Sequence, residues 1–510
     1  MLLLGLFSSG FLFSQVRFSS GFESGSLGEV KLIDSSWIKT TPTDSMLTLS
    51  YEVFSRFDPL NPVDTSLSPS GRWYYFRMTG VKGKQIFLNI RNSEAIRPFF
   101  SYDNKKFSRL EYAENINTGQ INKIFTRDTV YICHFIPYTC SHLNDKIDEW
   151  SKNSCVTTET LGQSFQGRLV KMLTITDPSV DKKYKKRVWI HGRTHPSESP
   201  SSWHLEYLID QLLDGSAYSK SILANTVFYV VPFINPDGVF WGCSRSTSTG
   251  VNIEINWDRP DSLTMPEVKL LRKKITELTS DRPLDLLLNM HSQIANSITY
   301  WIHTAESTSD EMYRKQLLLT NLTINDNPYF TSKDQSFSAV APRYVEGWMW
   351  NHFGNKTVAV TFETPYTFYK DDIDGEWVSL DNLNKLATNS LHAIGDYLEV
   401  KTPVRTAADI KVIKPRKWEK VDNNSMVYFG NDCFLSKGKK LKVKASLHLP
   451  EGGTYKIYSW VAGPTARISP EGTNCWKKVG TITVNKSGNH VWRGTSDMLN
   501  GVADKILLVK

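Results

Sequence analysis

Two histidines and a glutamate stand close together in HGRTHPSESPSSW, which covers residues 191–203 between an apolar run and an amphipathic one. Hydrolytic zinc sites commonly use two histidine nitrogens and one carboxylate, and leave a fourth position open for water. The HExxH motif, which places two histidines one helical turn apart, is absent from the sequence. His195 and Glu198 instead form His-x-x-Glu, which predicts a metal site in a loop whose third ligand comes from elsewhere in the chain.

His291 is the expected third ligand, because it directly follows the apolar run Leu284–Met290. A run of this length predicts a buried strand, and His195 follows a similar run at Arg187–Gly192. In α/β proteins, ligands bind beyond the carboxyl ends of the strands. We therefore expect His195, Glu198 and His291 to converge there on one zinc ion per chain.

A water activated by zinc needs a proton acceptor, and Glu363 is the candidate. It ends the apolar run Thr357–Glu363, a setting that is unusual for a solvated carboxylate. We predict that Glu363 acts as general base toward the water and then as acid toward the leaving amine. Arg245 follows the NPDG turn at Asn235–Gly238, and a fixed guanidinium there could stabilise the oxyanion of a tetrahedral intermediate.

These residues lie in a region, 153–401, where strand-like and helix-like patterns alternate. The alternation is typical of an α/β/α domain with a mixed central sheet. Two further buried strands and two amphipathic helices are predicted at Thr226–Ile234, Ile298–His303, Ser202–Gly215 and Pro266–Leu278.

Two other histidines are near the motif. His191 precedes the loop, so we expect it to face packing or polar groups behind the ligands. His204 is expected on the exposed side of its helix. A lone histidine after a strand is usually structural, and the metal prediction therefore depends on the combination of residues.

The flanking regions are rich in strand-like patterns. Residues 16–152 contain aromatic and β-branched runs such as WYYFRM and KQIFLNI between polar turns, which predicts an antiparallel β-sandwich. Residues 402–510 contain the alternating runs Lys440–Leu449 and Thr454–Val461, which predict a second, accessory β-sandwich.

Residues 1–15 are apolar and have the length of a signal peptide, although they lack the usual basic start. A signal peptide would make the protein periplasmic or extracellular; the alternative is a buried first strand. No later run is long and apolar enough for a transmembrane helix. Cys433 and Cys475 could form a disulfide in an exported protein, with free buried thiols as the equal alternative.

The net charge is +8, and the lysines and arginines are distributed along the chain. The basic cluster KKYKKR at Lys182–Arg187 is interpreted as a solvated loop. No basic stripe interleaved with aromatic residues accompanies it, so no nucleic-acid partner is expected.

The chain resembles the zinc metallocarboxypeptidase family in a series of features that follow one another in the same order. They are the His-Pro-x-Glu loop, the NPDG turn, the arginine, an Asn-Trp pair, the strand-end histidine and the strand-end glutamate. The cytosolic-carboxypeptidase-like branch is the most similar, because its motif RVHPGE is matched here by RTHPSE at Arg193–Glu198. The N-terminal β-sandwich of that branch resembles FSSGFESGSLGEV, GRWYYF and HFIPYTCSHL in this chain. A secreted, bacterial-type member is the expectation.

The resemblance implies roles for five residues. His195, Glu198 and His291 would be the zinc ligands. Arg245 would be the arginine that stabilises the oxyanion, and Glu363 would be the general base.

The sequence departs from this family where the substrate's C-terminal carboxylate is bound. The family reads D-L-N-R before an aromatic residue, and its Asn and Arg bind that carboxylate. Here Glu254 stands at the Asn position and Ile255 at the Arg position, followed by Asn256 and Trp257. Isoleucine cannot bind a carboxylate, and a glutamate would repel one.

Three interpretations follow from this departure. An exopeptidase could bind the carboxylate through Arg193, Arg259 or Arg343. An amide hydrolase could act without a free C-terminus, with Glu254 preferring a cationic group of the substrate. A pseudoenzyme is disfavoured, because the residues needed for zinc-water chemistry are present. Glu254 could also pair with a nearby arginine such as Arg259 and never meet substrate.

Asn256 and Tyr344 complete the expected substrate-binding set, with Tyr366 as the alternative to Tyr344 for the family's capping tyrosine. We predict a zinc-dependent peptidase or amidase that acts on a peptide or a peptidoglycan-type glycopeptide. The competing class is a non-catalytic binding protein for glycan or cell-wall peptide. Three tryptophans of the C-terminal region could stack on sugars, although core packing is the default for each: Trp460, Trp476 and Trp492.

Overall fold

The computed structural model describes residues 16–510 except 63, 116, 296–297, 326, 328–329, 332–333, 370–375, 422–423 and 431. The segment expected to be a signal peptide, residues 1–15, therefore lies outside the described residues. The chain divides into two compact units: residues 1–58, 69–137 and 241–244 form the first, and residues 59–68, 138–240 and 245–510 form the second.

The first unit contains two sheets that share one hydrophobic core. One sheet has the order β1 (Arg17–Ser19), β4 (Tyr75–Thr79), β9 (Thr129–Cys133), β6 (Phe99–Ser101) and β7 (Ser108–Arg109). The other has the order β2 (Val30–Lys39), β3 (Ser45–Phe54), β5 (Gln85–Arg91) and β8 (Gln120–Ile124). The expectation of purely antiparallel sheets is wrong at one place, because β3 and β5 pair in parallel.

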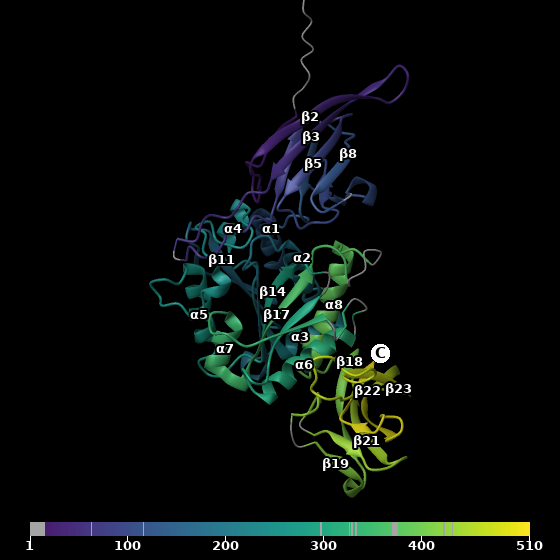
Figure 1. Ribbon diagram of the computed structural model, residues 1–510. Coiled ribbons are helices and arrows are strands. Elements are labelled where there is room, and N and C mark those ends of the chain that lie inside the picture. The colour runs from purple at the N-terminus through teal and green to yellow at the C-terminus, as the bar shows by residue number, and fades with distance from the viewer. Residues whose placement is uncertain are drawn as a thin grey trace, which may run out of the picture. The chain divides into compact units, whose positions relative to one another are not determined.

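The second unit is built on a mixed eight-stranded sheet (Figure 1). The three strands at its centre, β12, β14 and β17, are parallel to one another. β11 runs antiparallel to both of its neighbours, while β15 runs antiparallel to β17 and parallel to β16. The order is β10 (Val156–Gln163), β11 (Leu169–Ile175), β13 (Thr226–Val231), β12 (Lys186–Gly192), β14 (Leu286–Gln293), β17 (Val358–Pro365), β15 (Thr299–His303) and β16 (Gln335–Ser338).

Helices pack on both faces of this sheet (Figure 1). One face is covered by α2 (Ser199–Leu212), α3 (Ala217–Asn225), α6 (Asp310–Asn325) and α8 (Leu380–Tyr397). The other buries apolar residues of α5 (Pro266–Leu278) and α7 (Val345–Phe353) in one cluster with side chains of the central strands. The remaining helices are α1 (Cys140–Trp150) and α4 (Pro236–Trp241). The predicted α/β/α layering and mixed sheet are therefore present.

Two features of this region differ from the expectations. His291 and Glu363 lie within β14 and β17 rather than after them, since both strands continue for two residues past these positions. His204 is fully buried, and the expectation of an exposed side chain is wrong. The helix α2 is covered by α8 as well as by the sheet, so His204 lies opposite Ser390, with 3.1 Å between Nε2 and Oγ.

The C-terminal residues of the second unit form two antiparallel sheets around one cluster of buried side chains. The larger sheet has the order β23 (Cys475–Val484), β22 (Gly453–Val461), β26 (Lys505–Val509), β18 (Arg405–Val412), β21 (Lys442–Leu449) and β24 (Gly488–Thr495). The smaller consists of β19 (Trp418–Lys420), β20 (Phe434–Ser436) and β25 (Val502–Ala503).

The three tryptophans considered for sugar stacking are packed against protein. Trp460 is fully buried, donates from Nε1 to the Val427 carbonyl at 2.8 Å and contacts the Trp476 ring, while Trp492 is buried in the core cluster. These rings offer no support for carbohydrate binding. All six cysteines carry free thiols, so Cys433 and Cys475 are not bridged.

Candidate metal centre

Three side chains converge where β12 and β14 meet the loop between β12 and α2. The Nδ1 atom of His195 lies 2.7 Å from Oε1 of Glu198, and Nδ1 of His291 lies 2.8 Å from Oε2 of the same carboxylate. The two Nδ1 atoms are 3.2 Å apart. All three side chains are buried. One nitrogen from each ring and both carboxylate oxygens thus face a common point.

The 3.2 Å separation of the two Nδ1 atoms fits a zinc ion, whereas their separations of 2.7 and 2.8 Å from the Glu198 oxygens are hydrogen-bond distances. In a tetrahedral site with bonds of about 2.0–2.1 Å, neighbouring ligand atoms are roughly 3.3 Å apart, close to the separation of the two Nδ1 atoms. The Glu198 carboxylate contacts both imidazoles. The predicted ligands His195, Glu198 and His291 are therefore brought together by the fold.

The strand order explains why residues so far apart in sequence meet. Because β12 and β14 are adjacent parallel strands, with Gly192 paired to Met290, the loop after β12 begins next to His291. The first turn of α2 is tied to β14, since the amide of Ser201 donates to Ser292 Oγ at 3.0 Å. The Ser292 amide in turn donates to Oε2 of Glu198 at 3.1 Å and fixes that carboxylate.

Asn235 of the NPDG turn joins two parts of the site. Its Nδ2 donates to the carbonyls of Thr194 and Ser246, both at 3.2 Å, and its Oδ1 accepts from the Gly238 amide. Gly238 cannot be larger, because a Cβ there would lie 2.3 Å from Cγ of Pro196 and 2.7 Å from the Ser246 carbonyl oxygen. The turn therefore fixes the positions of two segments. One is the metal loop, the segment between β12 and α2 that contains His195 and Glu198, and the other is the segment around Arg245.

Glu363 lies on β17, next to the ligands. It is the register partner of His291 in the adjacent strand, and side chains of paired residues in parallel strands project to the same face. Its Oε2 is buried and has no hydrogen-bond partner among the described residues. An unpartnered buried carboxylate oxygen costs free energy unless a ligand or water meets it, which suits a proton acceptor that works on bound water.

Arg245 and Glu254 form the other side of the centre. The Arg245 guanidinium is half-buried and donates from Nη2 to Oε2 of Glu254 at 3.2 Å. The same Oε2 lies 3.1 Å from Nε2 of His195. Ligand atoms of His195, Glu254 and His291 lie within 4.8 Å of one another, so Glu254 could also contribute an oxygen to a metal ion there. Glu254 thus contacts both a predicted ligand and the predicted oxyanion arginine.

The charges of the metal-free centre shift several pKa values. Burial lowers the pKa of His291, but the carboxylates of Glu198, Glu363 and Glu254 outweigh it and raise that pKa to about 9. Burial opposes ionisation of Glu254, yet His195, His291 and Arg245 lower its pKa to about 2. Burial, followed by the negative charge of Glu198, raises the pKa of Glu363 to about 7. A carboxyl group with a pKa near neutrality is suited to both accept and return a proton.

Two of the expected substrate-binding residues, Arg193 and Asn256, form hydrogen bonds within the protein. All three nitrogens of the buried Arg193 side chain donate to the protein: Nε and Nη2 to the Pro196 carbonyl, and Nη1 to the Tyr138 carbonyl and Ser202 Oγ. The amide of Asn256 accepts from Met265 N and donates to the Leu263 carbonyl. Both side chains therefore brace loops, and their geometry gives no support for a role in binding substrate.

The tyrosine and arginine alternatives can also be located. Tyr344 precedes α7, and its ring lies under the guanidinium of the exposed Arg343 at 5.0 Å. Burial lowers the pKa of Arg245, but the carboxylates of Glu198, Glu254 and Glu363 outweigh it and raise that pKa. The buried Tyr366 adds to this increase and is therefore near the guanidinium. Arg259 is exposed, and the pairing of Glu254 with an arginine occurs through Arg245 instead.

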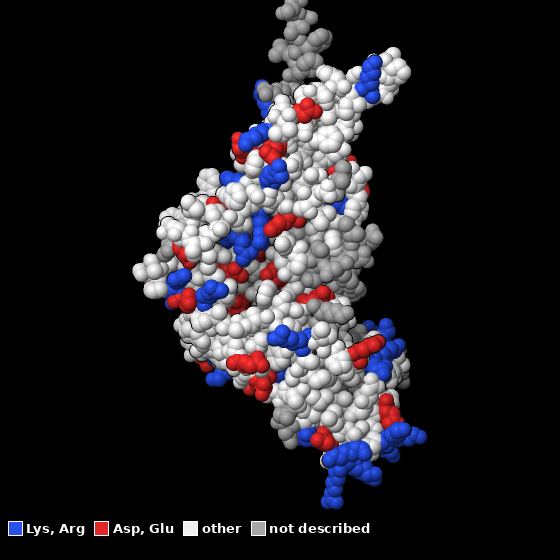
Figure 2. All heavy atoms as spheres, viewed as in Figure 1, with Lys and Arg blue, Asp and Glu red and all other residues white. Residues whose placement is uncertain are grey.

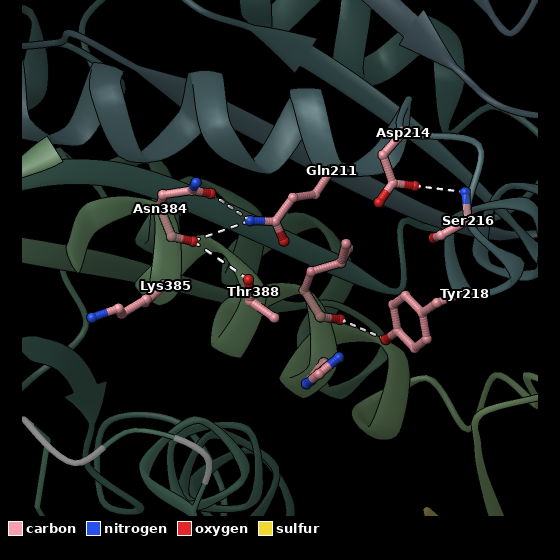
Figure 3. Close-up of a pocket in the computed structure, with 9 residues that line it drawn as sticks. Gln211, Asp214, Ser216, Tyr218, Asn384, Lys385 and Thr388 are labelled. Carbon is pink, nitrogen blue, oxygen red and sulfur yellow. Dashed lines mark hydrogen bonds between the residues drawn. The ribbon is translucent and has the colours of Figure 1, made fainter. Parts of the chain in front are cut away.

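A separate pocket of about 470 Å³ lies between the C-terminal end of α2, α3 and α8 (Figure 3). Its polar side chains largely bond to their own surroundings: Gln211 donates to the Asn384 carbonyl and Oδ1, and the Tyr218 hydroxyl donates to the Leu391 carbonyl. None of the metal-centre residues lines this pocket. It is therefore distinct from the candidate centre.

Several known proteins are similar to this chain. Residues 144–371 match the family model described as zinc carboxypeptidase. The chain is 24% identical to mouse cytosolic carboxypeptidase 6 over 429 residues, which cover 77% of this chain and 75% of the relative. It is 26% identical to bovine cytosolic carboxypeptidase 3, covering 54% of this chain and 29% of the relative. A metallo-carboxypeptidase from Burkholderia cenocepacia has a similar fold, with a TM-score of 0.60 and 20% identity over 74% of this chain and 98% of that structure.

Proposed function

We propose that the region at residues 144–371, which matches the zinc carboxypeptidase family model, binds one zinc ion through His195, Glu198 and His291 and hydrolyses peptide or amide bonds. The observation that carries the proposal is the convergence of two Nδ1 atoms and one carboxylate beside an unpartnered Glu363 oxygen. When bound, zinc would polarise a carbonyl group and lower the pKa of a water molecule.

The residues of the chain supply the remaining chemistry. Oε2 of Glu363 accepts the proton of the attacking water and then delivers it to the nitrogen of the leaving amine. The Arg245 guanidinium donates hydrogen bonds to the carbonyl oxygen as that atom gains negative charge. The position of Glu363 in the middle of a sheet keeps its carboxylate rigid relative to the ligands on the neighbouring strand.

Glu254 acts on the ligand rather than on the substrate. A histidine that binds zinc through one nitrogen usually donates its other N–H to a carboxylate, which fixes the ring orientation and raises ligand basicity. Nε2 of His195 is buried without a hydrogen-bond partner among the described residues, and Oε2 of Glu254 lies 3.1 Å away, within reach of this role. The same carboxylate holds Arg245 in place, so its negative charge is already balanced by two partners.

The manner of substrate binding is the second part of the proposal. Ile255 replaces the arginine that the family resemblance implies for the substrate carboxylate, and the Arg193 nitrogens donate to the protein. These observations favour an amide hydrolase that tolerates a blocked C-terminus over a strict exopeptidase. A non-catalytic binding protein is the alternative, and it predicts zinc binding without hydrolysis.

The test compares peptide pairs that differ only in a free or an amidated C-terminus. The protein is loaded with zinc, and cleavage is followed by mass spectrometry for the wild type and for Glu363→Gln. The proposal expects both peptides of a pair to be cut, with kcat lowered about 10²- to 10⁴-fold in Glu363→Gln at unchanged zinc content. Cleavage of the free acid alone would refute the amidase part. Absence of cleavage of a broad peptide library by the zinc-loaded wild type would favour the binding protein.

A further inference from the structure

The positive charge of the chain is concentrated at its C-terminal end. Residues 402–510 contain 19 lysines and arginines against 8 aspartates and glutamates, whereas the whole chain has 60 against 52. The preceding 401 residues therefore contain slightly more acidic than basic residues. Figure 2 shows basic side chains gathered at the end of this region that Figure 1 labels β19 and β21. An excess of this kind predicts attraction to a polyanionic partner.

Four of these cations share the outer face of the larger C-terminal sheet. Lys411 of β18 is paired with Lys444 of β21, and Lys444 is paired with Arg493 of β24. Lys442 lies two residues before Lys444 and therefore on the same face of β21. We call Lys411, Lys442, Lys444 and Arg493 the basic face. All four are exposed, while the opposite side of the same strands buries core residues such as Val443 and Trp492.

The basic face is not neutralised by the protein. None of its four side chains forms an ion pair with a described residue, whereas other lysines of this region do: Lys420 with Asp432 at 2.7 Å and Lys510 with Glu451 at 2.6 Å. The strands β21 and β24 contain no acidic residue, and Asp409 of β18, on the same side as Lys411, is paired with Lys505 at 3.1 Å. Like charges directly opposite one another across strands destabilise a sheet. The repulsion between these cations lowers the stability of the free protein, and an external anion bound to them would offset that repulsion.

The shape of this face favours a planar partner. Neighbouring strands are about 4.8 Å apart, and alternate residues of one strand are about 6.8 Å apart, so the four cations form a flat grid rather than a groove. Single-stranded nucleic acid would need aromatic side chains on which bases stack. The outward-facing residues of β21 and β24 include no Phe, Tyr or Trp, because Trp492 points into the core.

Two exposed apolar side chains accompany the charges. Val491 lies opposite Ser446 on the same face as Arg493, and half of its surface is exposed. Met498 is 40% exposed and follows Asp497, whose Oδ1 accepts the Lys440 amide next to the basic face. Asp497 is the acidic neighbour at this end. Apolar side chains beside a cluster of lysines and arginines are typical of surfaces that lie on anionic membranes.

We propose that the basic face docks the protein on the surface of a membrane rich in anionic phospholipid. No helix among the described residues has both the length and the apolarity needed to cross a bilayer, so this attachment is peripheral. Each lysine or arginine held near an anionic surface contributes a similar increment to binding, and the increments are screened by salt. The docking is independent of zinc and of the hydrolytic reaction.

The test is co-sedimentation of the full chain with vesicles of phosphatidylcholine, alone or with about one third phosphatidylglycerol. The wild type is expected to bind only the anionic vesicles and to be released between about 0.1 M and about 1 M salt. The variant Lys411→Gln/Lys444→Gln/Arg493→Gln is expected to bind at least about tenfold more weakly. The apolar residues 1–15 are present in every variant, so differences between variants cannot come from them.

Two control variants make the result specific. Lys182→Gln/Lys183→Gln/Lys186→Gln removes the same charge from another exposed basic cluster and is expected to bind like the wild type. Lys411→Arg/Lys444→Arg/Arg493→Lys retains the charge and is expected to bind as well, which separates loss of charge from loss of folding. Three outcomes would each overturn the proposal. They are equal binding to neutral and anionic vesicles, an equal loss of binding in both glutamine variants, and binding to DNA or polyglutamate but not to vesicles.

Discussion

His291 and Glu363 are register partners on adjacent parallel strands, β14 and β17, at the centre of the mixed sheet. One is a candidate zinc ligand and the other the candidate general base. The hydrogen bonds between the two strands fix the relative position of these residues, so their side chains need no direct contact. This relationship separates metal binding from proton transfer, so the two functions can be tested by different substitutions.

Removing a ligand should remove the metal. His195→Ala or His291→Ala deletes one of the converging Nδ1 atoms and should lower zinc affinity by more than about a hundredfold, since loss of an outer partner alone costs about 10- to 100-fold. Zinc content measured by mass spectrometry after dialysis checks this. His352→Ala is the control, because its ring binds the Trp348 carbonyl on α7. Wild-type zinc content in His195→Ala would contradict the ligand assignment.

Glu254 should tune the metal without binding it. Glu254→Gln keeps the size of the side chain but weakens the contacts with His195 and Arg245, and should lower zinc affinity about 10- to 100-fold. Competition with a chelating dye measures the affinity directly, independent of hydrolysis. Glu277→Gln, which removes an exposed carboxylate paired with Lys274, is the matched control. Unchanged affinity in Glu254→Gln would show that the carboxylate serves another purpose.

The NPDG turn should tolerate no side chain at its glycine. Gly238→Ala places a Cβ within 2.3 Å of Pro196 and should lower the free energy of unfolding by about 1–3 kcal/mol, because backbone and loop must shift to admit it. Urea unfolding measures this change, and zinc affinity should fall in parallel since Pro196 belongs to the metal loop. Gly438→Ala, where nothing lies within 4 Å, should leave both quantities unchanged.

A buried carboxyl group in the C-terminal part predicts a dependence of stability on pH. Burial raises the pKa of Asp504 from 3.8 to about 7. Between these values the folded state retains a proton that the unfolded state releases, so this group's contribution to stability is present at about pH 4 and is lost as the pH rises through 7. Asp504→Asn removes the titration. The difference in free energy of unfolding between wild type and variant should therefore change over this interval, and a constant difference would refute the assignment.

The proximity of four residues of the candidate centre could be predicted from sequence for a physical reason. His195, Glu198, His291 and Glu363 all stand at or near the carboxyl end of apolar runs long enough to be buried strands. Parallel strands bring such ends to one edge of a sheet, so local patterns were sufficient to expect their convergence. The family resemblance added the roles, and the comparison with zinc carboxypeptidases agrees with it.

The partners of Glu254 and the surroundings of Arg193 could not be predicted in this way. Both depend on how irregular loops fold back on the sheet, and loops have no periodic pattern that reports their path. The sequence indicated that Glu254 was unusual, but only the structure shows it between His195 and Arg245. Likewise, burial of His204 depends on α8, a helix far along the chain that covers α2.

The sequence by itself determined the chemistry available to this protein: the zinc-binding residue types, their order, the missing carboxylate-binding arginine and the excess of basic residues at the C-terminal end. The tertiary structure decided which of these groups meet. It placed the Glu254 carboxylate against His195, a candidate metal ligand, and aligned Lys411, Lys444 and Arg493 in one row. Strand order and register set these contacts, and they depend on hydrogen bonds between segments distant in sequence, which no local pattern specifies.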